Sequence, residues 1–188
     1  MTINRSAITR LILLGLVASI LQLTAASQVS IFGVPMDLSP LIVASVGFLA
    51  GSVPGMVFGF CFGLFADTAL MQTLGVTSLV LTVVGYGAGR VRELRDPAHG
   101  LAPVAVGAAA TAIAALSITL LQFLLGVEAP VSAQVVRQIL MTIVLNTLLA
   151  LPVYARVRRA LRPFLPDDPR RRRRRAYTTG GLSPLSRA

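Results

Sequence analysis

The stretch Gly47-Phe-Leu-Ala-Gly51-Ser-Val-Pro-Gly55-Met-Val-Phe-Gly59-Phe-Cys-Phe-Gly63 places a glycine at every fourth position. Residues four apart lie on one face of a helix, so these glycines predict a smooth stripe. A glycine face lets a second backbone approach closely, which favours helix packing in membranes. Gly85 and Gly89 repeat the spacing further along the chain. The spacing therefore predicts close helix contacts, either inside one bundle or with a transmembrane helix of another protein.

The composition sets the class of protein. The chain has 188 residues, of which 55% are hydrophobic and 13% charged, and its mean hydropathy is +0.79. Such a chain has too much apolar material for disorder and too little charge for an ordinary soluble domain. These values favour a small polytopic membrane protein, and its lone cysteine, Cys61, cannot form an internal disulfide.

The apolar segments predict six transmembrane helices in residues 1–162, an all-α architecture. The first apolar run is interpreted as a retained helix, because a cleaved signal peptide would explain that run alone. The block from Leu38 to Leu74 is too long for one span, and Ser52-Val-Pro-Gly55 near its middle predicts a break. Its first half is short, so we expect it to thin the bilayer or to lie partly at the interface. The predicted spans are about 8–26, 38–51, 53–71, 74–89, 101–126 and 132–154.

The arginines decide between five and six spans. With six spans and both termini in the cytoplasm, 16 of the 17 arginines lie inside and only Arg137 lies outside. Because cytoplasmic segments are enriched in positive charge, six spans with this orientation are favoured over five.

Residues 163–188 predict a disordered cytoplasmic tail. Its six consecutive arginines are predicted to anchor it to anionic lipids rather than to nucleic acid: Arg170, Arg171, Arg172, Arg173, Arg174 and Arg175.

Four polar residues within the predicted spans are candidates for specific contacts. Asp67 either caps a helix start after a turn, faces water at the outer leaflet, or pairs with Arg137 or a partner protein. Asn146 lies near the middle of its span, where an amide usually bonds across to another helix, and Gln138 could do likewise. One histidine, His99, and one cysteine offer no usual catalytic or metal-binding set, so neither an enzyme nor a cofactor is predicted.

The glycines belong to a longer pattern. It runs Gly59-Phe-x-x-Gly63-Leu-x-x-Asp67, then Leu74-Gly75, then Gly85-Tyr-Gly-Ala-Gly89. This pattern resembles MreD, the family of bacterial rod shape-determining membrane proteins. The segment Phe32-Gly-Val-Pro35 with Asp37 is similar to the family's segment before the second span. The resemblance covers about residues 31–92.

The resemblance implies a function that composition does not show. MreD-like proteins are non-enzymatic scaffolds of the cell-elongation (rod) complex in the bacterial cytoplasmic (inner) membrane, which builds side-wall peptidoglycan. They bind an MreC-like single-span protein, in a complex with actin-like MreB, a RodA-type glycosyltransferase and a class-B penicillin-binding transpeptidase. Their compact bundle is similar to the substrate-binding subunits of energy-coupling-factor transporters. The glycine stripe is then the predicted docking surface for the MreC-like helix. The alternative function is the substrate-binding membrane subunit of a vitamin-type transporter.

Overall fold

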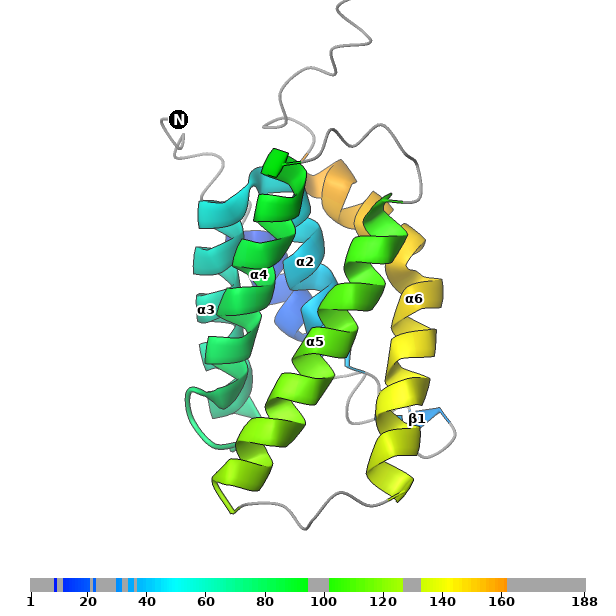
Figure 1. Ribbon diagram of the computed structural model, residues 1–188. Coiled ribbons are helices and arrows are strands. Elements are labelled where there is room, and N and C mark those ends of the chain that lie inside the picture. The colour runs from blue at the N-terminus through cyan, green and yellow to red at the C-terminus, as the bar shows by residue number, and fades with distance from the viewer. Residues whose placement is uncertain are drawn as a thin grey trace, which may run out of the picture.

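The computed structural model describes residues 9, 12–20, 22, 30–31, 34–35, 37–94, 102–126 and 133–161. This part of the chain is a helical bundle, apart from a two-residue pairing between β1 (Ser30–Ile31) and β2 (Val34–Pro35). Residues 12–20 are helical and fall in the first predicted span. The further helices run roughly along one axis (Figure 1): α2 (Ser39–Ala50), α3 (Ser52–Ala69), α4 (Val76–Leu94), α5 (Ala102–Leu124) and α6 (Ala133–Leu161).

Helix α2 is the central element. It has 12 residues, and all of them except Ala50 are buried. It contacts α3, α4, α5 and α6, and Figure 1 shows it between α4 and α6. At 1.5 Å per residue it is about 18 Å long, well short of the roughly 30 Å hydrocarbon core. Protein covers nearly all of this helix, and its place in a thinned bilayer or partly at the interface stays a prediction.

The chain breaks between α2 and α3 at a single residue, Gly51. Its φ of 107° lies in the region that favours glycine. The break lies one residue before the Ser52–Gly55 segment predicted to contain it. Pro54 lies in the first turn of α3, where a missing N–H costs no helical hydrogen bond.

Three of the described helices are long and apolar enough to cross a membrane: α3, α5 and α6. Helices α4 and α6 end at Leu94 and Leu161, later than the predicted ends near 89 and 154. Their last turns carry Arg92, and Arg158 with Arg159. Arginine is a good helix former, and its charge is favourable near a helix C-terminus, so the helices continue past the apolar segments.

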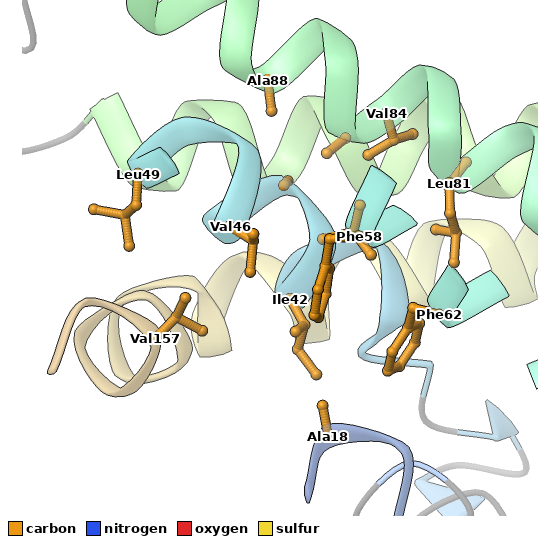
Figure 2. Packing of buried hydrophobic residues seen from close by; sticks show 14 of the residues in the cluster. Ala18, Ile42, Val46, Leu49, Phe58, Phe62, Leu81, Val84, Ala88 and Val157 are labelled. Atoms are coloured by element: carbon orange, nitrogen blue, oxygen red, sulfur yellow. The ribbon is translucent and has the colours of Figure 1, made fainter. Parts of the chain in front are cut away.

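The hydrophobic core surrounds α2 (Figure 2). Ile42, Val46 and Leu49 of α2 belong to one buried cluster with residues of the other helices. In that cluster the rings of Phe58 and Phe62 on α3 stack with centroids 5.8 Å apart. The outer faces of the helices instead expose large apolar side chains, as a lipid-facing surface requires. We call the end where α4 and α6 finish the upper end, and the end with the α3–α4 turn the lower end.

Candidate functional site

The close contact of α2, α3 and α4 is made by three glycines. A Cβ at Gly47 or at Gly55 would clash with the carbonyl oxygen of Gly85, and one at Gly85 would clash with the carbonyl oxygen of Gly55. Only glycine lets these backbones meet. The three helices therefore form a tight unit, which we call the glycine-packed unit (39–94).

The contact continues above and below this crossing. A Cβ at Gly59 would clash with the backbone of Leu81, and one at Gly63 with the backbone of Ser78. Gly89 on α4 faces the backbone of Ser52 at the upper end. Backbone of the same chain thus occupies the space over six of the seven predicted glycines, and the seventh, Gly51, makes the break. A partner helix cannot use these faces without displacing α2, α3 or α4.

At the upper end, two charged residues of α4 hold the break between α2 and α3. The Glu93 carboxylate accepts hydrogen bonds from Ser52 N (3.1 Å) and Ser52 Oγ (2.7 Å), at the start of α3. The Arg92 guanidinium donates to the carbonyl oxygen of Leu49, near the end of α2. An acid near a helix start and a base near a helix end both suit the helix dipole. We call this arrangement the charged clasp (Leu49, Ser52, Arg92, Glu93).

The environment of Glu93 favours its ionised form. The hydrogen bonds from the Ser52 hydroxyl and amide lower the pKa of this carboxyl, and Arg90 contributes in the same direction. The Arg90–Glu93 pair, at 3.2 Å, is the only ion pair within the described ranges. Both side chains are partly exposed, so the pair itself adds little to stability.

At the lower end, Asp67 joins α3 to the start of α4. Its Oδ2 accepts hydrogen bonds from Gly75 N (2.8 Å) and Ser78 N (3.4 Å). The Ser78 hydroxyl in turn donates to the carbonyl oxygen of Phe60 (3.0 Å). Asp67 is 0% exposed, so it caps the helix after the turn and does not face water. Its Oδ1 is the one buried side-chain oxygen or nitrogen without a partner among the residues the structure describes.

A second polar cluster ties the glycine-packed unit to α5 and α6. Asn146 Nδ2 donates to Thr111 Oγ1 on α5 (3.2 Å) and to the carbonyl oxygen of Asp37, just before α2 (2.7 Å). Gln22 donates to Asp37 Oδ1 (3.0 Å) and accepts from Leu38 N (3.1 Å). These bonds satisfy partly buried backbone groups at the start of α2.

The remaining predicted residues lie apart from these contacts. Arg137 and Gln138 are exposed on the lower part of α6, and no ion pair links Arg137 to Asp67 within the described ranges. Arg170 to Arg175, His99 and the predicted tail lie outside the described residues.

Sequence reasoning missed six residues that make these contacts: Gln22, Ser52, Ser78, Arg92, Glu93 and Thr111. Two features of the sequence could have indicated them. One is an acid next to a helix-ending arginine, and the other is the presence of polar side chains within apolar runs.

The contacts described above hold helices in place, and the described residues offer little for binding a metal ion or a small molecule. Within the described part of the chain, no group of three or more His, Cys, Asp or Glu side chains could hold a metal ion. A crevice between α2, α5 and α6 has no internal space that would admit even a water molecule. Sites for small organic ligands commonly have roughly 300–1,000 Å³. What the geometry provides is a fixed stack of three helices, closed by polar contacts at both ends.

Comparison with known proteins identifies the family of this chain. The family model for the rod shape-determining protein MreD matches residues 4–160, which include all of the described helices except the last residue of α6, Leu161. Neither curated proteins nor solved structures give a significant match. The family match covers far more than half of the 188 residues. The chain therefore belongs to the MreD family of rod shape-determining membrane proteins.

Proposed function

We propose that this chain is a non-enzymatic scaffold of the bacterial rod complex, and that it binds an MreC-like single-span protein. The observation that carries the proposal is the family match over residues 4–160. The tightly packed helices support it, because a scaffold needs a surface of fixed shape. Through the MreC-like protein, the chain would help to organise a RodA-type glycosyltransferase and a class-B penicillin-binding transpeptidase for side-wall peptidoglycan synthesis.

The proposed topology has six spans in the cytoplasmic membrane, with both termini in the cytoplasm. In this arrangement the upper end of the bundle is cytoplasmic. Among the described residues, Arg90, Arg92, Arg156, Arg158 and Arg159 lie at that end, and Arg137 lies on the lower part of α6. This distribution fits the positive-inside rule. The arginine tail would then lie against the anionic headgroups of the same leaflet.

The outward face of α3 is the surface that we assign to the MreC-like helix. It exposes Val53, Val57, Phe60 and Leu64, at spacings of three and four residues. This face lies opposite the glycines, on a helix held at its start by the charged clasp and at its end by Asp67. A helix fixed at both ends offers a preformed surface, which lowers the entropic cost of association.

Co-purification from the native host tests the scaffold. The tagged protein is extracted in a gentle detergent, and the chains recovered with it are identified by mass spectrometry. Recovery of an MreC-like protein, with a RodA-type enzyme and a transpeptidase, is the expected result. Recovery of ATP-hydrolysing subunits with a large membrane coupling protein would instead indicate a transport component and overturn the proposal.

The natural Cys61 tests the docking surface. It is exposed on α3, and it is the only cysteine of the chain. Single cysteines are placed along the transmembrane helix of the MreC-like partner, and disulfide cross-links to Cys61 are induced in membranes. We expect cross-links at partner positions that repeat every three or four residues. A Cys61→Ser, Leu148→Cys variant is the matched control, because Leu148 is exposed on α6. Equal cross-linking from both positions would contradict the assignment to α3.

A further inference from the structure

The last turns of α6 form a distinct feature at the upper end of the bundle. Pro152 lies inside this helix, where it offers no N–H to the carbonyl oxygen of Leu148 and favours a bend. Figure 1 shows the turns after it leaning over toward α2. Val157 and Leu161 in these turns belong to the buried core cluster around α2. We call residues 153–161 the α6 cap.

The outer side of the α6 cap is cationic. Arg159 is two residues from both Val157 and Leu161, so the helical period of about 3.6 residues places it on the opposite face. Arg156 and Arg158 adjoin Val157 in sequence and therefore lie on the two flanks. All three arginines are exposed. The cap is thus apolar toward the core and positively charged away from it.

In the proposed topology the α6 cap lies beyond the hydrocarbon core. The part of α6 from Ala133 to Pro152 is about 30 Å long, at about 1.5 Å per residue. The hydrocarbon core is also about 30 Å thick, so this part can cross it alone. The cap then lies at the cytoplasmic surface, and because it leans toward α2, it covers part of the bundle itself.

No acid among the described residues neutralises this surface. Glu93 is the described acid at the upper end, and Ser52 and Arg90 engage it. Asp37 precedes α2 and Asp67 lies at the lower end, and both accept hydrogen bonds from backbone N–H groups. The one ion pair within the described ranges includes no arginine of the cap. The three guanidinium groups of the cap can therefore bind an acidic partner.

We propose that the α6 cap is a docking surface for an acidic segment of a cytoplasmic protein, with Arg159 at its centre and Arg156 and Arg158 beside it. Carboxylates match guanidinium groups in charge and in hydrogen-bonding geometry. Anionic lipid is the other class of partner for arginines near a membrane. The lean of the cap over the bundle favours protein, because headgroups surround the bundle whereas an acidic chain can approach its end from the water. The inference rests on the proposed topology, but it does not require the MreC-like protein.

Peptide binding in a lipid disc without net charge tests this surface. The full-length chain is placed in phosphatidylcholine nanodiscs, with Gln in place of Arg170 to Arg175 so that the tail does not compete. The probe is a fluorescein-labelled peptide of alternating Glu and Ala, and a control peptide has Gln in place of Glu. Fluorescence anisotropy should show saturable binding of the acidic peptide only. A wrong topology would not affect this result, because both faces of a nanodisc are open to solution. It would be detected separately, by labelling cysteines from one side of the membrane.

Matched charge variants and photo-cross-linking place the peptide on the cap. Arg159→Gln should weaken its binding by up to about fivefold, the usual contribution of one exposed ion pair. Arg137→Gln removes the same charge from the lower part of α6 and should leave the affinity unchanged. In a second experiment, photoreactive benzoylphenylalanine replaces Ala155, which is exposed one helical turn before Arg159, or Ala109, which is exposed on α5. We expect the acidic peptide to cross-link from position 155 and not from position 109, also in nanodiscs that contain phosphatidylglycerol.

Three results would overturn the proposal. One is equal affinity of the Arg159→Gln and Arg137→Gln variants for the acidic peptide. Another is equal cross-linking from positions 155 and 109, which would mean attraction without a defined surface. The third is formation of lipid adducts in place of peptide adducts at position 155 in phosphatidylglycerol nanodiscs, which would assign the cap to anionic headgroups instead.

Discussion

Gly59 has no room for even one methyl group. The Cβ of an alanine at this position would clash with the backbone of Leu81, whereas Gly87 on α4 has nothing within 4 Å of the same atom. The two glycines therefore form a matched pair, one at a close helix contact and one in open space. The pair separates the effect of packing from the general effect of glycine on a helix.

We expect Gly59→Ala to destabilise the bundle by at least about 2 kcal/mol, because rigid backbone has to move to relieve the overlap. Gly87→Ala should instead be neutral or stabilise by up to about 1 kcal/mol, the usual preference of a helix for alanine. Both variants are compared with the wild type by thermal stability in one detergent, followed by size-exclusion chromatography. Equal melting temperatures for the two variants would contradict the packing role of Gly59.

Asp67 provides a second prediction for a single residue. Asp67→Ala removes the acceptor for Gly75 N and Ser78 N and should cost about 1–3 kcal/mol, the penalty for buried N–H groups that lose a partner. Asp67→Asn keeps one carbonyl oxygen and should cost less. The same thermal assay measures both. The control is Thr68→Ala, since the exposed Thr68 hydroxyl bonds only to carbonyl oxygens of its own helix. An Asp67→Ala variant as stable as Thr68→Ala would contradict the capping role.

At the scale of the elements, the charged clasp makes the junction of α2 and α3 sensitive to pH. The pKa of the Glu93 carboxyl is lowered in the folded protein by Ser52 and Arg90. The stability that it contributes is therefore complete above its ordinary pKa, about 4.3, and is lost as the pH falls through the lower folded value. The difference in melting temperature between wild type and Glu93→Gln should be largest near neutral pH and shrink in acid. A difference that grows in acid would contradict this sign.

The helices themselves could be predicted well from the sequence, because apolar runs mark them directly. The split of the Leu38–Leu74 block followed from its length and from Pro54, and the structure breaks it at Gly51. The central position of α2 could not be predicted. Its apolar residues would suit lipid or protein equally well, and much of its cover comes from α4, α5 and α6, which lie further along the chain.

The polar contacts were predictable only in part. Asp67 lies close in sequence to the turn and helix start that it caps, so capping was among its predicted roles. Glu93 and Ser52 are 41 positions apart, and Asn146 and Asp37 are 109 apart. Pairings at such separations depend on the three-dimensional arrangement of helices, which spacing along one chain does not determine.

At the scale of the whole molecule, the proposed topology places the α3–α4 turn on the outer side of the membrane and the end of α6 on the inner side. Gln72 is exposed in that turn, and Arg156 is exposed near the end of α6. In a Cys61→Ala background, we expect a membrane-impermeant maleimide to label Gln72→Cys in intact spheroplasts and Arg156→Cys only after permeabilisation. The buried Asp67 would be an unsuitable position for this measurement. Labelling of both variants from the same side would contradict the six-span arrangement.

The burial of α2 also constrains how the protein is made. A helix about 18 Å long, covered by α3 to α6, cannot be a stable span on its own when it leaves the ribosome. We expect it to stay at the insertion machinery, paired first with α3 across Gly51, until later helices cover it. Chains that end before α5 would thus expose an incomplete core in the bilayer and become substrates for membrane proteolysis. Completion of synthesis, rather than entry into the membrane, is then the step that commits this chain to its folded state.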